Sequence, residues 1–497
     1  MTFKKYIPFL LLVFPFLIHA QTKLYTEQYR PQFHFSPAKN WCNDPNGLVY
    51  KDGVYHLFYQ HNPFGNQWGH MSWGHATSKD LIHWKHLPVA LKEENEVMIF
   101  SGTCVVDKNN TSGFGKNGKI PMVAVYTGHI ENISQSQHIA YSLDDGITWT
   151  KYNNNPILDL HKKDFRDPKI FWYEPKKYWV MCLMLPVEHI VQFYSSKNLK
   201  TWEHLSDFGP AGDTSGVWEC PDLTAVPIEG MANKKKWLLQ MSQNASMQYF
   251  VGGFDGVSFT NENTAAKINR PDYGPDYYAA IAYNQLPATV LPTAIGWINN
   301  WNYANDIPTT PWKSAMSLPR NLSVQKINEE WILIQKPIPA VSLLRKKIFH
   351  VANEMVDTIK NIPFNSNQFE MECDLFPGPS SVSGIRIAAG ADHYFEIGYD
   401  AVKQLFYIDR SRSGNTSFHE NFKKIARFEK NISLKNNKLR LDVYYDHSIV
   451  EVFINDGEAV FTSQVFAAEK DTGIYLFSNG EKCRYSDLTL WKIKTVW

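Results

Sequence analysis

Short apolar runs separated by turn-forming residues repeat along the first two thirds of the chain. Hairpin-like runs recur at a spacing of roughly 55 to 70 residues, and each follows a shorter first run. The first runs are 47–50, 102–106, 169–173, 223–226 and 278–283; the second are 54–60, 122–128, 178–185, 237–243 and 290–297. Runs of this length are typical of β-strands joined by tight turns.

A third feature follows the second run in each of the first three units. A serine, a turn and a tryptophan recur at Ser78 to Trp84, Ser142 to Trp149 and Ser196 to Trp202, with a weaker echo at 254–259. Four short strands per unit and five units predict a five-bladed β-propeller.

The pattern changes after residue 337. From about residue 353, many short stretches alternate apolar and polar residues, which is typical of a β-sandwich. We therefore predict an all-β chain with a propeller over 21–337, a linker over 338–352 and a sandwich over 353–497. His447 and Glu451 fall in the sandwich and are expected to be structural, since nothing near them in the sequence forms a reaction centre.

The first twenty residues have the pattern of a signal peptide. Lys4 and Lys5 precede an apolar run over 7–18, and the small Ala20 precedes polar Gln21. The run is shorter than the ~20 apolar residues that span a bilayer, so no membrane span is expected. A buried N-terminal helix is the alternative. A signal peptide over 1–20 would export the protein to the periplasm or the extracellular space.

Composition narrows the class of partner. The formal net charge is +1, from 50 basic and 49 acidic residues, so no broad field attracts nucleic acid. Aromatic residues make up 14% of the chain and include 16 Trp, which suits the stacking of sugars, although Trp is also a good core residue. The six cysteines lack CxxC spacing, which argues against a zinc site. Cys373 and Cys483 could form a disulfide.

Three acidic residues stand beside aromatic residues just ahead of first strands. Asp44, Asp167 and Glu219 belong to units one, three and four, and we expect them to share one phase of the repeat. The first strand of each propeller blade lies innermost, so the three carboxylates should meet at one end of the central channel. Independent surface turns would have no reason to keep that phase.

Convergent carboxylates could bind calcium or cleave a glycosidic bond. Arg166 argues against calcium, because a fixed cation beside the ligands weakens metal binding. Glycoside cleavage needs a nucleophile, an acid that donates and regains a proton, and groups that hold sugar hydroxyls. Arg166 is expected to keep Asp167 ionised. No cofactor and no metal are expected.

Four motifs together resemble the signatures of glycoside hydrolase family 32, the invertases, inulinases and levanases. They are 41–47, 100–102, 166–168 and 219–221. The resemblance extends through 58–63, 297–301 and 315–320 to 446–457, and so covers nearly the whole mature chain. Each motif alone is modestly specific, but their joint occurrence in this order is very specific.

The resemblance implies a secreted β-fructofuranosidase that acts with retention on fructans or sucrose. By this resemblance Asp44 would attack the anomeric C2, Glu219 would be the acid and base, and Asp167 would stabilise the transition state. Family positions that hold the fructosyl unit are matched by Asn43, Gln60, Trp68, Ser101 and Arg166, with Phe100 and Trp301 as apolar walls. Gln60, Trp68 and Trp301 also have structural readings, as a strand residue or as core.

Two departures from the family pattern stand out. Cys42 replaces the usual Met, and Pro275-Asp276 stands where plant invertase-like members carry a Lys. Together with the export signal, the second departure favours an exo-acting fructan hydrolase over a dedicated sucrase. Alternatives are a fructosyltransferase with the same three acids, a non-catalytic sugar-binding propeller and an inverting arabinanase-like enzyme.

Overall fold

The computed structural model describes residues 25–264 and 266–497, and its elements are almost all β-strands. The predicted signal peptide over 1–20 lies outside the described residues. Within the described ranges, the one α-helix is α1 (Glu420–Lys424), and no helix is long and apolar enough to cross a bilayer. Short 3-10 turns are η1 (Glu174–Lys176), η2 (Ala304–Asp306) and η3 (Pro339–Leu344).

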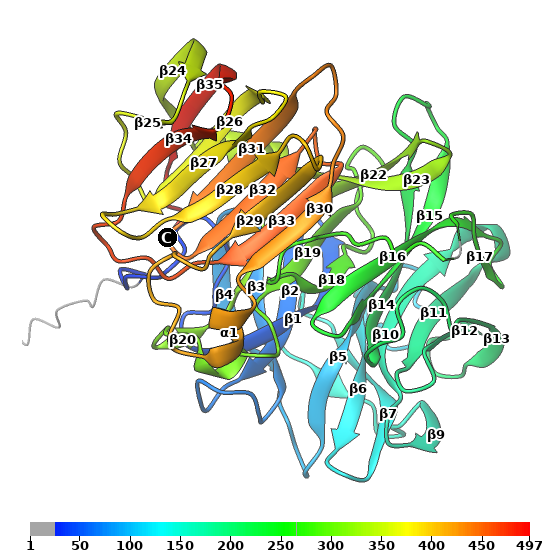
Figure 1. Cartoon of the computed structure of the whole chain (residues 1–497). Helices are drawn as coiled ribbons and strands as arrows, with labels where there is room; N and C mark the ends of the chain where they lie inside the picture. The colour runs from blue at the N-terminus through cyan, green and yellow to red at the C-terminus, as the bar shows by residue number, and fades with distance from the viewer. Residues whose placement is uncertain (1–24, 265) are drawn as a thin grey trace, which may run out of the picture.

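Five sheets occupy the first two thirds of the described chain (Figure 1). Sheet one contains β20 (Trp312–Lys313), β1 (Asn40–Lys51), β2 (Val54–Asn62), β3 (Ser72–Ser78) and β4 (Trp84–Leu91). Sheet two contains β5 (Met98–Val106), β6 (Met122–Ile130), β7 (Ser134–Ser142), β8 (Thr150–Lys151) and β9 (Leu158–Lys162). Sheet three contains β10 (Arg166–Tyr173), β11 (Tyr178–Leu185), β12 (Ile190–Ser196) and β13 (Glu203–Phe208). Sheet four contains β14 (Trp218–Pro227), β15 (Lys235–Gln243), β16 (Ser246–Phe254) and β17 (Phe259–Asn261). Sheet five contains β18 (Tyr278–Ala282), β19 (Thr293–Ile298), β21 (Ala315–Met316), β22 (Arg320–Ile327) and β23 (Glu330–Pro337).

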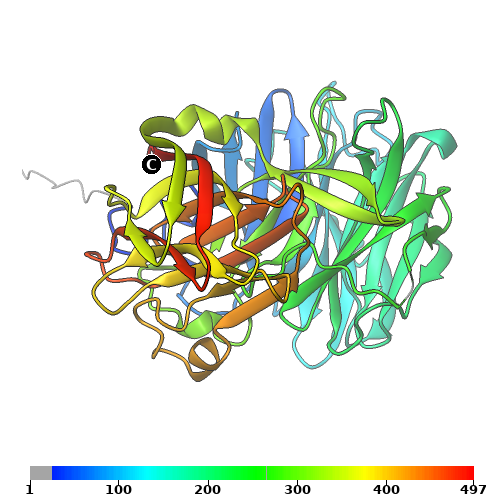
Figure 2. The ribbon, with the colours of Figure 1, turned by 45° about the horizontal axis from the view of Figure 1, so that its top comes forward.

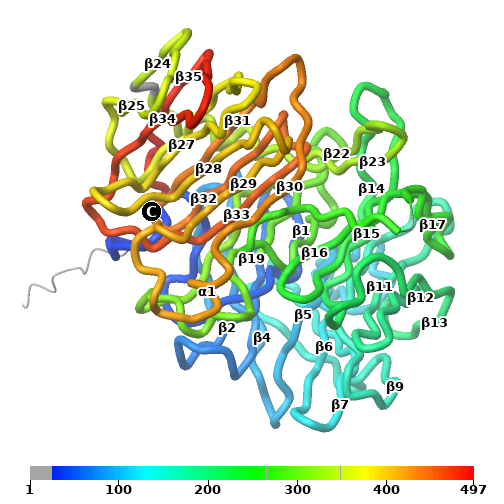
Figure 3. Tube along the Cα trace, in the orientation of Figure 1, coloured from blue at the N-terminus to red at the C-terminus, as the bar shows by residue number. Residues whose placement is uncertain are grey.

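The innermost strands close a ring. β1 contacts β5, β5 contacts β10, β10 contacts β14, β14 contacts β18, and β18 contacts β1. Late in the propeller sequence, β20 returns to pair in parallel with β1 of the first sheet. The predicted five-bladed propeller is thereby confirmed, and the Cα trace in Figure 3 shows the blades following one another in chain order.

Apolar faces of neighbouring blades pack together and hold the ring. Between blades one and two, for example, Phe58 and Trp73 pack with Cys104 and Tyr126 in one buried cluster. Burying large aromatic side chains removes a large apolar area from water, which is the main favourable term in folding. Because neighbouring blades cover both faces of each blade, most residues of its strands are apolar in the sequence.

Every innermost strand carries a β-bulge near its start. In each blade, two residues of the first strand face one residue of the second strand. The bulged pairs are Asn43-Asp44, Phe100-Ser101, Asp167-Pro168, Cys220-Pro221 and Ala279-Ala280. The acids were expected in turns ahead of the strands, but Asp44, Asp167 and Glu219 lie inside them. Asn43, Pro168 and Pro221 are among the bulged residues.

Two six-stranded sheets form the predicted β-sandwich beside the propeller (Figure 2). Between them lies one continuous apolar core. One sheet contains β24 (Arg345–Val356), β35 (Cys483–Ile493), β26 (Gln368–Phe376), β31 (Leu439–Asp446), β32 (Ile449–Ile454) and β33 (Ala459–Gln464). The other contains β25 (Ile359–Asn361), β34 (Gly473–Asn479), β27 (Val382–Ala389), β28 (Phe395–Asp400), β29 (Leu405–Asp409) and β30 (Arg427–Asn431).

The structure corrects the expected linker over 338–352. Only the segment around η3 joins β23 to the sandwich, and β24 begins at Arg345 and pairs along its length with β35. β24 is an edge strand, and most of its described side chains are exposed or half-exposed, so it lacks the apolar alternation that marks a buried strand. Cys373 and Cys483 are separate buried thiols in the sandwich core, so the disulfide considered from the sequence is not formed.

A buried network of charges joins the sandwich to the propeller. Arg320 on β22 donates to Glu451 on β32 at 2.7 Å and to Asp272 at 3.0 Å, and none of these side chains is exposed by more than 1%. His34 donates from Nδ1 to Asp446 and from Nε2 to Glu451, at 2.8 and 3.0 Å. Glu451 therefore has the structural role expected of it. Removing one partner would leave an uncompensated buried charge, which is strongly destabilising.

The His34 contacts predict a pH-dependent stability. Burial would lower the pKa of His34, but its hydrogen bonds to Asp446 and Glu451 outweigh burial and raise the pKa from 6.5 to about 9. The contribution to stability is then fully present below pH 6.5 and is lost as the pH rises through 9. We expect the free energy of unfolding to fall by roughly 3 kcal/mol over that range. Urea unfolding at several pH values measures this fall.

A His34→Gln variant isolates the effect. It keeps a polar side chain but cannot carry a proton in this range, so this component of the pH dependence should disappear even though the variant is less stable overall. An identical fall in the two proteins between pH 6.5 and 9 would contradict the assignment to His34.

Candidate active site

One cleft of about 340 Å³ opens at the end of the propeller where the bulges lie. All ten residues singled out from the sequence line it. They are Asn43, Asp44, Gln60, Trp68, Phe100, Ser101, Arg166, Asp167, Glu219 and Trp301. Three further lining residues, His129, Gln135 and Asp164, were not predicted. The structure thus brings the predicted set together, while the role of each residue remains a prediction.

Asp44 lines the cleft and is only 9% exposed. Ser101 Oγ donates to Oδ2 at 2.7 Å, and Asn43 Nδ2 donates to Oδ1 at 3.1 Å. Burial, with the nearby Glu219 charge, raises the pKa of Asp44 above its ordinary value, although the hydrogen bonds oppose this. The carboxylate is therefore held in one orientation by donors on both oxygens.

Asp167 lies beside Asp44 and is 6% exposed. The Cys220 backbone N–H donates to Oδ2 at 2.9 Å, and the Cys220 thiol lies 3.6 Å from both Asp167 Oδ2 and Asp44 Oδ2. Burial, opposed by the charge of Arg166 and supported by the charges of Glu219 and Asp44, raises the pKa of Asp167 to about 7. The expectation that Arg166 keeps Asp167 firmly ionised is therefore wrong, because burial outweighs the cation.

Arg166 donates to Asp164 Oδ1 at 2.7 Å and, among the three predicted acids, makes its closest contacts with Glu219. Its Nη2 and Nε donate to Glu219 Oε1 at 3.0 and 3.2 Å, whereas its Nε lies 3.9 Å from Asp167. Tyr278 OH donates to the other oxygen, Oε2, at 2.5 Å. Burial, followed by the charge of Glu219, raises the pKa of Tyr278 well above its ordinary value, so the phenol stays a donor. Glu219 is more exposed than the two aspartates, at 24% of its side chain.

The bulges show that the three acids do not share one phase of the repeat. Glu219 precedes its bulge, Asp167 is the first bulged residue of its blade, and Asp44 is the second. The prediction of a common phase is wrong by one or two residues. The three carboxylates therefore reach one cleft from three blades, although each acid has a different position relative to the bulge of its own strand.

Hydrogen bonds instead connect equivalent positions on neighbouring blades. Arg166, Glu219 and Tyr278 each precede a bulge, on blades three, four and five, and both Arg166 and Tyr278 donate to Glu219. Likewise Ser101 donates to Asp44, and both are second bulged residues. Tyr278 was missed because its region was predicted only to lead into unit five. Its equivalence to Arg166 and Glu219 becomes visible only when the repeats are aligned on their bulges, which requires the strand pairing.

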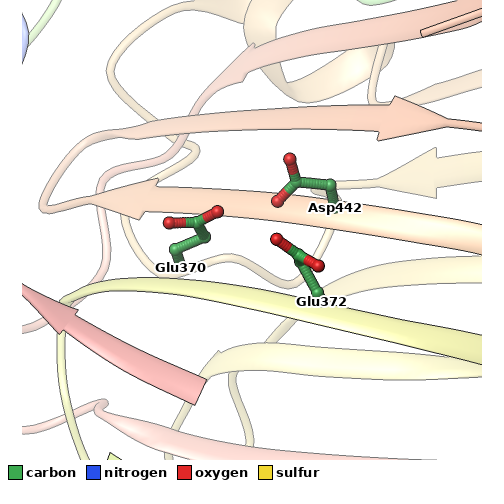
Figure 4. Close-up of side chains that lie close together, drawn as sticks. All are labelled: Glu370, Glu372 and Asp442. Atoms are coloured by element: carbon green, nitrogen blue, oxygen red, sulfur yellow. The ribbon is translucent and has the colours of Figure 1, made fainter. Parts of the chain in front are cut away.

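A second group of carboxylates lies outside the cleft, in the sandwich. Glu370 and Glu372 on β26 and Asp442 on β31 point toward one another, with oxygen atoms within 4.8 Å (Figure 4). Arg345 donates to both glutamates and Arg440 donates to Glu372, so guanidinium groups already neutralise the cluster. Burial, together with Glu370 and Glu372, raises the pKa of Asp442 well above its ordinary value. These contacts describe an ion-pair network and not a reaction centre.

The cleft has the groups that glycoside cleavage requires. Two buried carboxylates lie beside a third, more exposed one, and Trp68 and Trp301 expose 42% and 38% of their surfaces at the rim. Exposed aromatic faces beside polar groups suit a sugar, which has apolar ring faces and polar edges. Trp301 is held by ring contacts with Trp41 and Trp297, so this wall is rigid.

Comparison with known protein families gives matches over most of the chain. A model described as the glycosyl hydrolases family 32 N-terminal domain matches residues 34–337. A second model, glycosyl hydrolases family 32 C terminal, matches residues 341–492. The two models meet close to the change from propeller to sandwich.

Individual relatives are similar over nearly the full chain. A levanase of Bacillus subtilis is 42% identical over 96% of this chain and 72% of its own length. An extracellular exo-inulinase of Aspergillus niger is 39% identical over 95% of this chain and 96% of its own. Among solved structures, the exo-inulinase of Aspergillus awamori superposes with a TM-score of 0.90 at 37% identity, covering 95% of this chain and 100% of that one. A β-fructofuranosidase of Schwanniomyces occidentalis, complexed with fructosyl-erythritol, has a TM-score of 0.85 at 31% identity, with 95% and 98% covered.

The contact between Tyr278 and Glu219 predicts a positioning role. A Tyr278→Phe variant keeps the ring and removes only the donor to Oε2, so Glu219 should lose its fixed orientation. We expect kcat for glycoside cleavage to fall roughly tenfold, with KM changed less than kcat. Steady-state kinetics on one substrate measures both constants. Replacing the buried Tyr277 with Phe provides the matched control, because within the described residues Tyr277 makes no hydrogen bond to the three acids; equal losses in both variants would contradict the assignment.

Proposed function

The chain belongs to glycosyl hydrolase family 32, and from that premise we propose how its cleft cleaves the substrate. It is a glycoside hydrolase of the β-fructofuranosidase type, acting on fructans or sucrose with retention. Asp44 is the nucleophile, Glu219 the acid and base, and Asp167 the residue that stabilises the transition state. The observation that most supports these roles is that the three carboxylates line one cleft.

In the first step an oxygen of Asp44 forms a bond to the anomeric C2 of the fructosyl unit. The bond between C2 and the glycosidic oxygen breaks, and Glu219 gives its proton to that oxygen, which leaves as a hydroxyl. Donors from Asn43 and Ser101 hold the attacking carboxylate. Positive charge develops on the sugar ring in the transition state, and the adjacent Asp167 would hold its hydroxyls there.

In the second step water replaces the leaving group. Glu219, now a carboxylate, takes a proton from water as the water oxygen bonds to C2, and the ester to Asp44 breaks. Two displacements at C2 give net retention. Arg166 and Tyr278 contact both oxygens of Glu219, so they would keep its carboxyl group in place through both steps.

The cleft favours a terminal fructosyl unit. Its volume of about 340 Å³ is near the lower end of the range for small-molecule sites, about 300 Å³. The two aspartates are more buried than Glu219, so we expect a terminal fructosyl unit to enter the cleft first. Exo-action on the fructosyl ends of levan, inulin or sucrose follows.

Export is part of the proposal. Curated relatives include extracellular exo-inulinases. The basic and apolar pattern of residues 1–20 would direct this chain along the same route, to the periplasm or the outside of the cell. Levan and inulin are polymers, so an exported enzyme would hydrolyse them outside the cytoplasm.

Substitution of the two central carboxylates gives a sharp prediction. Asp44→Asn removes the nucleophile and Glu219→Gln removes the proton donor, so each should lower kcat on sucrose by roughly 10³-fold or more. With a p-nitrophenyl β-fructoside, whose leaving group needs little protonation, kcat/KM reports the first step; it should fall much less for Glu219→Gln than kcat/KM on sucrose does, while Asp44→Asn should lose as much on both substrates.

Circular dichroism and the unfolding midpoint should match the parent protein, since both changes are nearly isosteric. Near-normal turnover of sucrose by either folded variant would contradict the proposed mechanism. An equal loss by Glu219→Gln on both substrates would contradict its role as the acid.

The product profile tests the substrate class. Incubation with levan, inulin and sucrose should release free fructose from the first minutes, without intermediate oligosaccharides, and the first anomer released should be the β form. Longer oligosaccharides formed from concentrated sucrose would identify a transferase, and early oligosaccharides from inulin or levan would identify endo-action. No release from any of the three would overturn the function.

A further inference from the structure

An aromatic row lines one wall of the cleft and ends at a residue with no role in the mechanism above. Phe100 packs edge-on against Trp68 at 6.1 Å and stacks on His129 at 4.2 Å, with ring planes 15° apart. His129 lies near the end of β6 and lines the cleft, where it is half-buried. Its ring is therefore fixed in position by Phe100.

Hydrogen bonding determines which ring nitrogen of His129 carries the proton. Gln135 Oε1 accepts from the Phe165 backbone N–H at 2.9 Å and from Arg166 Nη1 at 3.2 Å, which orients the Gln135 amide. The amide Nε2 lies 3.2 Å from His129 Nδ1 and can only donate. His129 Nδ1 must then accept, and the proton of the neutral ring is on Nε2.

The other ring nitrogen is left as a donor. In the described residues, His129 Nε2 has no protein partner, although the ring lines the cleft. Burial, followed by the charge of Arg166, lowers the pKa of His129, which favours the neutral ring. A neutral N–H donor beside an aromatic row matches the hydroxyl groups of a sugar.

The position of His129 indicates which sugar it meets. A chain of contacts runs from Glu219 through Arg166 and Gln135 to His129, and it does not pass through Asp44 or Asp167. His129 is thus linked to the acid Glu219, and among the described residues it has no hydrogen bond to either aspartate. The leaving sugar must lie beside Glu219, because Glu219 protonates its oxygen.

We propose that His129 binds the leaving-group sugar by donating from Nε2–H to one of its hydroxyls, and so contributes to the choice among sucrose, levan and inulin. This inference rests on the proposed function. It assigns a specificity-determining residue to the leaving-group side of the cleft. Gln135 acts through His129 by fixing its tautomer.

A comparison of two substrates tests the inference. His129→Phe keeps a ring against Phe100 and removes the donor. For sucrose and 1-kestose, kcat/KM should fall about five- to tenfold, the usual worth of one neutral hydrogen bond. For methyl β-D-fructofuranoside, whose leaving group is only methanol, it should change less than twofold. His129→Gln restores a side-chain N–H and should recover part of the loss.

His83→Phe is the matched control, since His83 is exposed and does not line the cleft. An equal loss on sucrose and on the methyl fructoside would overturn the inference, because His129 would then serve the fructosyl unit or the fold. Unchanged kinetics on all substrates would overturn it too. If the parent protein cleaves none of these substrates, the proposed function itself fails, which is a distinct result.

Discussion

The bulge repeated in every innermost strand is the constraint on which the active site depends. A regular ladder would pair all backbone groups at the start of each first strand and alternate its side chains between the blade faces. An extra residue breaks that alternation at the mouth of the channel. Asp167, Cys220 and Ala279, the first bulged residues of blades three, four and five, adopt positive φ angles of 67°, 51° and 52°. Such backbone costs about 1 kcal/mol or more per non-glycine residue, and hydrogen bonds between blades, such as Cys220 N–H to Asp167, offset it.

The same geometry creates an electrostatic conflict that the site uses. Four carboxylates, those of Asp44, Asp164, Asp167 and Glu219, line the cleft with the single guanidinium of Arg166. Burial and mutual repulsion raise the pKa of Asp44 and Asp167. Arg166 resolves part of the conflict by pairing with Glu219, so its charge is placed beside the group that exchanges a proton. Hydrogen-bond donors from neighbouring blades hold the carboxylates of Asp44, Asp167 and Glu219 in fixed orientations. Water molecules in their place would have to reorient during the reaction.

The sandwich contributes to the site without lining its floor. Arg410 from the sandwich donates to Asp276 at 2.8 Å and to Tyr303 OH at 3.0 Å, and Tyr303 donates to Asp276 at 2.5 Å. Tyr303 follows closely on Trp301, whose ring forms part of the cleft wall. Together with the Arg320 and Glu451 pair, these buried contacts fix blade five, which also carries Tyr278. A rigid interface of this kind suits a cleft in which the rim residues Trp68 and Trp301 lie in loops.

The sequence by itself determined the repeat, the propeller and the sandwich, because strand period and turn residues are local signals. The repeat also pointed to the three acids, whereas the other seven residues of the cleft were implied by the resemblance of the motifs to family 32. The sequence could not determine the staggered phase of the three acids, since a bulge is visible only against its partner strand. Nor could it determine that Arg166 pairs with Glu219, that β24 begins at Arg345, or that Tyr278, Gln135 and His129 belong to the site. Each of these depends on neighbours far away in the chain, and such neighbours meet only when the ring closes.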